Sequence, residues 1–506
     1  MLNKPPNIVM IMTDQQRADT IQGLGAGWMT TPAMDRLVGN GVSFRQAFCC
    51  GATCISSRAA LFTGMYPHNI GVYSFDNWAH QRTWLHDFRE AGYHLINIGK
   101  MHHSPIAAPM AFHERVIVEN KTSLADCDAW KQFCESRGKE KPRRRHARYP
   151  DWGERLNALV FEDDPGYVED EQSDMFVGDR AMERLERWDA DSGQPLFMQI
   201  GFPGPHEPYD PPRRFYEMYQ GKPVPPRIFR EGELKTKPEE WEQLRWYFGS
   251  CEADALIRFD GKSDAEIAEM RRHYYANITG IDEKIGGIIE ILKRKEMLEN
   301  TIIVFTSDHG DNLGDHDMPY KWVMPDSVVR VPLVICTPQT IGKPCVIEEL
   351  MSQMDIGPTL LELAGLDVPT RLDGRSRAAI VAGGSVTEWD DAVFCEDNYL
   401  TMIRTSTAKL VYYAGQDYGE LYDLETDPDE VVNLWDDVDH LPLRMALESR
   451  LLAFLTRSVY MNSGYKTQDP KPCYRKRFPQ TNAPGNRLLQ GSFDTLEEPW
   501  AQAAKE

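Results

Sequence analysis

The chain has 506 residues, a formal net charge of −21 and an apolar fraction of 42%. This length exceeds the size at which one hydrophobic core stops growing, so two domains are expected. The apolar content excludes a disordered protein. The strong negative charge argues against nucleic acid or an anionic membrane as the main partner. We therefore expect a folded protein of two domains whose partners are neither nucleic acid nor membrane.

The start of the chain and its cysteines indicate the compartment. The only apolar run near the start, Ile8 to Met12, is too short for a signal-peptide core or a membrane span, and no later segment is long enough. The ten cysteines show no paired Cys-x-x-Cys spacing. We therefore expect reduced thiols and a cytoplasmic protein.

Apolar runs and helix caps alternate along the chain. The runs predict buried strands at residues 8–12, 95–98, 196–200, 302–305 and 333–336. Helices are predicted between them: Pro32 stands at a first helical position, residues 83–92 end in glycine, and 263–266 form a capping box. Strands that alternate with helices predict an α/β fold with a mainly parallel sheet covered on both faces.

Three regions depart from this pattern. Residues from about 126 to 174 are charged and contain proline, which predicts an insertion over the sheet edge. Residues 373–457 show shorter strands and a terminal helix, which predict a small α+β domain beside a main domain at 1–372. Residues 458–506 are rich in Pro, Gly, Gln and Asn. This segment is either a flexible tail or an arm that packs on a neighbouring subunit of a homo-oligomer.

A candidate nucleophile lies in the run Cys54-Ile55-Ser56-Ser57-Arg58. If Cys54 caps the helix that this run predicts, the i,i+4 spacing puts Arg58 on the same face as the sulfur. The helix N-terminus adds partial positive charge and free N–H donors. This arrangement suits a nucleophile that meets an anion. The alternative is a buried thiol beside an ordinary arginine.

Two pairs of polar residues follow predicted strands. Asp14 and Gln15 come after the first strand, and Asp308 and His309 come after residues 301–307. In open parallel sheets, ligands bind outside the carboxyl ends of the strands. Two carboxylates, an amide oxygen and an imidazole can form a site for one divalent cation. A single aspartate there is more often a helix cap or turn residue, but two such pairs beside Cys54 favour the site.

Four cationic or titratable side chains also lie beyond strand ends: Lys100, His102, His206 and Lys321. Taken singly, each is more often a surface residue or a satisfied core residue. Their shared position predicts a site in which a cation, an arginine and two lysines converge on a tetrahedral oxyanion. The histidines then remain for proton transfer.

These motifs resemble those of the sulfatase family of the alkaline phosphatase superfamily. Residues 54–58 resemble its Cys-x-Pro/Ala-Ser-Arg signature, and residues 99–102 resemble its Gly-Lys-x-His motif. Residues 7–16 and 306–316 resemble its two metal-binding segments. The motifs occur in the family's order over most of the chain. The resemblance implies an alkaline phosphatase-like catalytic domain at 1–372 and hydrolysis of small-molecule sulfate monoesters.

The resemblance also implies a modified nucleophile. In the family, a formylglycine-generating enzyme oxidises the cysteine that matches Cys54 to formylglycine, and the hydrate of its aldehyde attacks sulfur. The implied roles of the other side chains are orientation of the hydrate by Arg58, neutralisation of the sulfate oxygens by Lys100 and Lys321, protonation of the leaving group by His206, and base catalysis by His102.

By the same resemblance, one divalent cation is bound by Asp14, Gln15, residue 54, Asp308 and His309. Ca²⁺ is the expected ion. Gln15 replaces an aspartate of many members, and His309 stands where others have asparagine. Both changes lower the negative charge and add nitrogen, so Mn²⁺ is the alternative.

Three other functions are considered. A phosphonate monoester or phosphodiester hydrolase of the same superfamily shares the Asp-Gln start and the Asp-His pair but lacks the Lys-x-His pair. A non-catalytic relative that binds an anion is favoured only by Ser56, which stands where maturation enzymes prefer proline or alanine. A cysteine hydrolase would use the Cys54 thiolate directly and need no metal.

Overall fold

The computed structural model describes residues 4–73, 76–119, 121, 123–142, 156–164, 166–250, 261–385 and 389–461, with side chains up to residue 458. Most of the segment predicted as a tail or arm, 458–506, lies outside these residues, as does part of the predicted insertion at 126–174. The chain forms two compact units, Met1–Asn433 and Leu434–Glu506.

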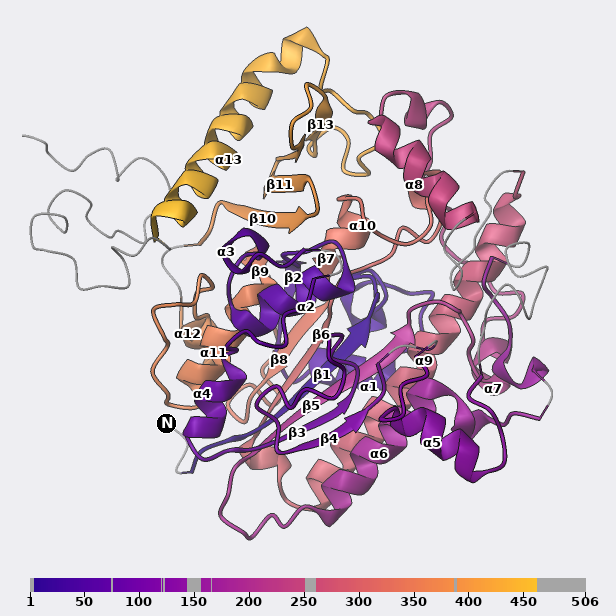
Figure 1. The fold of residues 1–506 in the computed structure, drawn as a ribbon, viewed down its shortest axis with the longest axis vertical. Coiled ribbons are helices and arrows are strands. Elements are labelled where there is room, and N and C mark those ends of the chain that lie inside the picture. Colours follow the sequence, from indigo (N-terminus) through magenta and orange to yellow (C-terminus); the bar gives the residue numbers. More distant parts are fainter. Residues whose placement is uncertain are drawn as a thin grey trace, which may run out of the picture. The chain divides into compact units, whose positions relative to one another are not determined.

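The first unit contains a nine-stranded, mainly parallel sheet (Figure 1). Its strand order is β4-β3-β5-β1-β6-β8-β2-β7, and β9 pairs with β2. The strands are β1 (Asn7–Asp14), β2 (Val42–Phe48), β3 (His94–Gly99), β4 (Glu114–Ile117), β5 (Leu196–Pro205), β6 (Thr301–Ser307), β7 (Arg330–Val331), β8 (Leu333–Cys336) and β9 (Cys345–Ser352). The prediction of a mainly parallel sheet is confirmed. Antiparallel pairing is confined to β7 and β8, which pair with β2 and β6.

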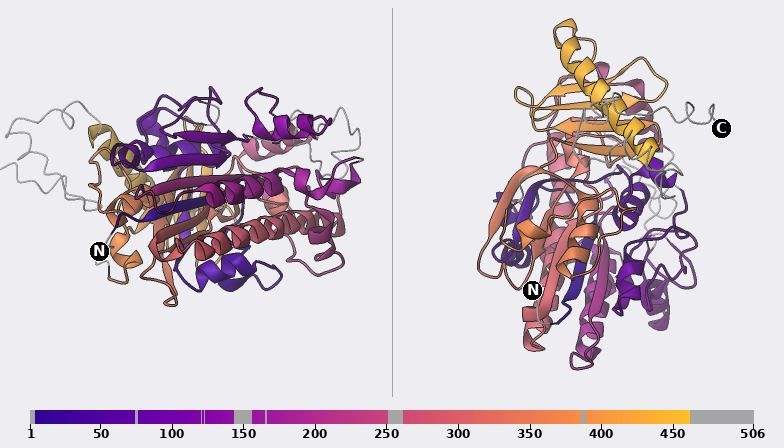
Figure 2. Two further views of the ribbon diagram at one scale, coloured as in Figure 1. Left: turned by 90° about the horizontal axis from the view of Figure 1, so that it is seen from below. Right: turned by 90° about the vertical axis from the view of Figure 1, so that its left-hand side faces the viewer.

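Helices lie on both faces of this sheet (Figure 2). The helices of the first unit are α1 (Pro32–Val38), α2 (Cys54–Thr63), α3 (Pro67–Ile70), α4 (Leu85–Glu90), α5 (Ala129–Ser136), α6 (Ser173–Arg187), α7 (Arg213–Glu217), α8 (Glu239–Ser250), α9 (Asp264–Arg294), α10 (Asp326–Val329), α11 (Ile356–Leu363) and α12 (Ala378–Val381). All residues of β5 and β6 are buried. Covering both faces explains why the central strands are apolar runs and not alternating patterns.

A second sheet follows in the sequence. Its four antiparallel strands, in the order β10-β11-β12-β13, are β10 (Ala392–Asp397), β11 (Leu400–Thr405), β12 (Ala408–Tyr413) and β13 (Gly419–Asp423). The second unit contains helix α13 (Leu441–Met461). The expected C-terminal short strands and helix are therefore present, while the domain boundaries 1–372 and 373–457 stay predictions.

The pairing of the central strands positions the site. β1 lies between β5 and β6 and is parallel to both, with Thr13 opposite Ser307. Asp14 ends β1 and Asp308 directly follows β6, so the two residues lie side by side at the carboxyl end of the sheet. Across the part of the chain that the structure describes, none of the helices has the length and apolarity that crossing a bilayer requires.

Candidate active site

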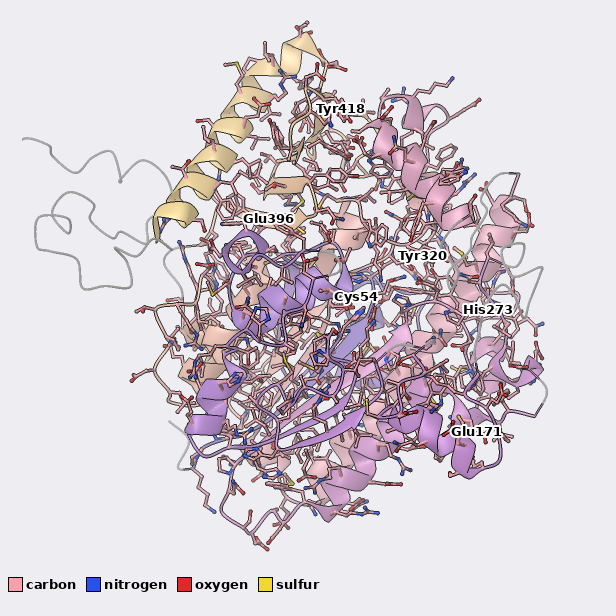
Figure 3. All side chains as sticks on the ribbon, in the orientation of Figure 1. Cys54, Glu171, His273, Tyr320, Glu396 and Tyr418 are labelled. Atoms are coloured by element: carbon pink, nitrogen blue, oxygen red, sulfur yellow. The ribbon has the colours of Figure 1, made fainter. Side chains whose placement is uncertain are left out.

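The predicted nucleophile stands at the first turn of α2. The helix begins at Cys54 itself, and its N-cap is Thr53, so Cys54 is the first helical residue and not the cap. The Cys54 side chain lies between α2 and the central strands (Figure 3), and the residue is only 4% exposed. Its Sγ lies 3.1 Å from Lys321 Nζ, 3.2 Å from His309 Nε2, 3.5 Å from Asp14 Oδ1 and 3.8 Å from Lys100 Nζ.

Arg58 bridges the carboxylates of Asp14 and Asp308. Its side chain is fully buried, and its Nε donates to Asp308 Oδ2 at 2.8 Å. A terminal nitrogen lies 3.3 Å from Asp14 Oδ2, and the other donates to the carbonyl of Lys100 at 3.0 Å. Lys100 also forms an ion pair with Asp14. One guanidinium therefore fixes groups from β1, β6 and the loop after β3, as its rigid fork allows.

Four residues could hold a metal ion. One ligand atom from each of Asp14, Cys54, Asp308 and His309 lies within 4.8 Å of the other three. The Nδ1–H of His309 donates to the carbonyl of Gly310 at 2.8 Å, which leaves Nε2 toward Cys54 as a ligand atom. Two buried carboxylates, an imidazole nitrogen and the group at position 54 fit a divalent cation.

Gln15 lies at the edge of this cluster. Its backbone has a φ of 70°, in the left-handed region, and its N–H donates to Asp308 Oδ1 at 2.9 Å. Its Oε1 accepts from Lys321 Nζ at 2.6 Å. Its Nε2 donates to Glu207 Oε2 and to Asp311 Oδ2, each at 2.7 Å. The structure thus brings Gln15 to the site, and its role as a metal ligand stays a prediction.

Glu207 and Asp311 were not predicted from the sequence as site residues. Glu207 directly follows His206, and Asp311 lies three residues after Asp308. An extra carboxylate beside a predicted ligand was the available signal. It carries little weight alone, because most such carboxylates are solvated or cap a turn.

The two predicted catalytic histidines come from different loops, His102 after β3 and His206 after β5. His102 lies close to Cys54 and contributes to lowering the pKa of its thiol. Its backbone is left-handed, with a φ of 57°, and is held by Glu119, which accepts its N–H at 2.6 Å. His206 donates its backbone N–H to the carbonyl of Asp14 at 3.1 Å, and its side chain is 24% exposed. His206 therefore stands at the open rim of the site.

The charges around Cys54 favour an anion. Burial opposes charge on the sulfur, but Lys100 and Lys321 outweigh it and hold the pKa of the thiol well below its usual range. Burial also raises the pKa of Asp14, yet Lys100 and neighbouring cations leave it below its ordinary value. Two lysines therefore flank the sulfur directly, inside a chain of net charge −21. The site can attract an anionic group at short range.

A hollow of about 670 Å³ lies beside the loop that carries Lys321. Its aromatic lining is Trp246, Tyr247, Trp322 and Tyr399. Trp322 directly follows Lys321. Its backbone N–H donates at 3.4 Å to the carbonyl of Ala52, a residue that lies just before α2. Trp322 thus connects the hollow to the loops that carry Lys321 and Cys54, although none of the lining residues belongs to the cluster around the sulfur.

The sequence and the fold match known proteins. The sequence model of the family described as "Sulfatase" matches residues 6–366, and that of "N-sulphoglucosamine sulphohydrolase, C-terminal" matches 314–457. The chain is 30% identical over 455 residues to the arylsulfatase of Clostridium perfringens (strain 13 / Type A), covering 85% of this chain and 90% of that protein. It is 30% identical over 446 residues to the choline-sulfatase of Rhizobium meliloti (strain 1021), covering 86% and 83%.

Among solved structures, the phosphonate monoester hydrolase of Agrobacterium radiobacter superposes with a TM-score of 0.75 at 26% identity. The superposition covers 90% of this chain and 96% of that one. These matches extend over the strands and loops that carry the cluster around Cys54.

Proposed function

Because the chain belongs to the sulfatase family and is therefore a sulfuric ester hydrolase, we propose that it cleaves sulfate monoesters with a formylglycine hydrate at position 54 and one divalent cation. Its fold is the alkaline phosphatase-like fold of this family. The observation that carries the proposal is the placing of two lysines, a carboxylate and an imidazole within 3.8 Å of the Cys54 sulfur. In the matured protein, a hydrate oxygen takes the place of this sulfur.

One set of side chains in the site would bind the cation. Asp14, Asp308, His309 and residue 54 would hold the cation, with Gln15 as a further ligand. The bound cation supplies Lewis-acid polarisation and favours a deprotonated nucleophile. Ca²⁺ is the proposed ion, and Mn²⁺ is the alternative.

The remaining residues orient the ester and move protons. Lys100 and Lys321 bind the sulfate oxygens, because their Nζ atoms already flank the sulfur of Cys54. Arg58 holds the carboxylates and thereby orients residue 54. His206, at the open rim, protonates the leaving alcohol, and His102, beside residue 54, acts as the base. The expected cytoplasmic location and homo-oligomeric state stay predictions.

Removing the metal should abolish turnover. Dialysis against EDTA is expected to lower kcat for 4-nitrophenyl sulfate by at least about 100-fold, because charge on the transferring group loses its strongest stabilisation. Ca²⁺ or Mn²⁺ should restore the rate, and their relative effect identifies the preferred ion. Activity that survives thorough chelation contradicts the proposal and favours a cysteine hydrolase that uses the thiolate directly.

Maturation must act on the unfolded chain. Cys54 is 4% exposed and Ser56 is fully buried. The Ser56 hydroxyl donates to Asp397 Oδ2 at 3.0 Å, so the signature is enclosed on folding. We propose that a formylglycine-generating enzyme converts Cys54 before the chain folds. An unconverted thiol in protein made together with that enzyme favours the non-catalytic, anion-binding alternative.

Phosphonate ester hydrolysis is a second candidate function. It is favoured by the similarity to the phosphonate monoester hydrolase structure, at 26% identity and a TM-score of 0.75. Lys100 and His102 at the sulfur favour sulfate instead. The kcat/KM values for a phenyl phosphonate ester and for 4-nitrophenyl sulfate, measured on one preparation, decide between them. A much larger value for the phosphonate overturns the preference for sulfate.

The aromatic hollow is proposed to hold the organic group of the ester. Trp246 is 65% exposed there, so its replacement should leave the fold intact. Trp246→Ala is expected to raise KM for an aryl sulfate about fivefold with little change in kcat, since about 1 kcal/mol of apolar contact is lost. Ile341→Ala, which removes an exposed side chain between β8 and β9, is the control. An unchanged KM for Trp246→Ala contradicts the assignment.

A further inference from the structure

Two carboxylates outside the metal-binding cluster enclose the amide of Gln15. The side chains of Gln15 and Asp311 are fully buried, and Glu207 is 6% exposed. Both carboxylates accept from the same atom, Gln15 Nε2, at 2.7 Å. Hydrogen bonds to charged acceptors are stronger than neutral ones, and burial increases their strength.

This contact determines which way the amide points. A primary amide nitrogen carries two N–H donors and accepts no hydrogen bond. Each donor of Gln15 has a carboxylate partner, so its Oε1 must face the opposite way, toward Lys321 Nζ at 2.6 Å. The flipped amide would place its oxygen against two carboxylates. The hydrogen-bond network therefore assigns this orientation uniquely.

The carboxylates are themselves held in place. Asp311 Oδ2 also accepts from the hydroxyl of Tyr209 at 2.7 Å, and its Oδ1 accepts from the N–H of Leu313 at 2.7 Å. On the other side, the carbonyl of Gln15 accepts from the hydroxyl of Tyr274 at 2.7 Å. Tyr274 thus holds the backbone carbonyl of Gln15, while Glu207 and Asp311 hold its amide nitrogen.

We propose that Glu207 and Asp311 are positioning residues that require an amide at position 15. They present its Oε1 to the cluster as a neutral ligand for the cation, and they exclude a carboxylate there by repulsion. This inference rests on the proposed function, because it assumes that the cluster binds a divalent cation. It explains why an amide, and not a further carboxylate, stands between Lys321 and the carboxylates of Glu207 and Asp311.

The isosteric change Gln15→Glu tests the inference, because the inference predicts that this change lowers the affinity for Ca²⁺ instead of raising it. A carboxylate is ordinarily a better Ca²⁺ ligand than an amide. Against Glu207 and Asp311, however, the new carboxylate meets like charges in a buried site. We expect Q15E to weaken Ca²⁺ binding, measured by isothermal titration calorimetry, at least about tenfold. In the triple variant Q15E/E207Q/D311N, whose new amides can donate to Glu at position 15, affinity should recover at least about tenfold relative to Q15E.

The E207Q/D311N variant with Gln15 is the matched background, and thermal unfolding reports whether each variant folds. If Q15E does not fold, Q15E/E207Q and Q15E/D311N, each of which relieves one repulsive contact, replace it in the comparison. Q15E that binds Ca²⁺ as tightly as the wild type, or more tightly, overturns the inference, as does a triple variant without recovery. A wild-type protein that binds neither Ca²⁺ nor Mn²⁺ overturns the proposed metal site instead, and the inference with it.

Discussion

Replacing Cys54 with alanine should lower kcat for 4-nitrophenyl sulfate at least about 10⁴-fold, because the variant has no precursor of the nucleophile. The charges that now surround the sulfur remain, so the ester should still bind. KM or the inhibition constant of inorganic sulfate is therefore expected to change much less than kcat. Cys134→Ala is the matched control, since Cys134 is a buried free cysteine in α5.

The mass of the peptide that contains Cys54 makes this experiment decisive. Active wild-type protein should carry an aldehyde in place of the thiol, and Cys134→Ala should show the same conversion with kcat within about twofold. Unchanged hydrolysis by Cys54→Ala excludes the formylglycine mechanism altogether. Activity together with an unmodified Cys54 thiol in the wild type points instead to direct attack by a thiolate, whose pKa the lysines hold low.

The sequence predicts the sheet and the strand ends well because both depend on local patterns. Runs such as Ile8 to Met12 are apolar throughout, which indicates strands covered on both faces. The side chains that follow such strands must then lie at one edge. This reasoning found Asp14 and Asp308, which the pairing of β1 with β6 places side by side.

The contacts within the site could not be predicted in the same way. Gln15 and Asp311 are 296 positions apart, and no local pattern indicates that an amide and a carboxylate will meet. The sequence likewise does not predict which aromatic side chains are buried and which are exposed. Trp78 and Tyr209 are buried in the core, whereas Trp246 is exposed and lines the hollow, and no local sequence pattern distinguishes them. Which face of an aromatic residue is covered depends on the tertiary fold.

Replacing Arg58 with leucine is expected to destabilise the fold more than any surface change. Its guanidinium, fully buried, bonds to Asp308 and Asp14. With leucine, these two buried carboxylates lose a positively charged partner. We expect this to lower the unfolding free energy by about 3–5 kcal/mol in the presence of EDTA. Urea titration measures this loss. Arg36→Leu is the control, because its ion pair with Glu290 is about half exposed, and a loss below about 1 kcal/mol is expected.

The effect of Ca²⁺ on the unfolding free energy of Arg58→Leu then tests whether the cation binds at Asp14 and Asp308. A cation bound by Asp14 and Asp308 supplies positive charge where the guanidinium has been removed, and a ligand that binds the native state raises its stability. Saturating Ca²⁺ should therefore stabilise Arg58→Leu more than it stabilises the wild type, and it should leave Arg36→Leu with the wild-type response. Equal stabilisation of all three proteins would mean that the cation binds away from these carboxylates. A loss in EDTA no larger than that of Arg36→Leu would mean that Lys100, which also pairs with Asp14, compensates the charges without Arg58.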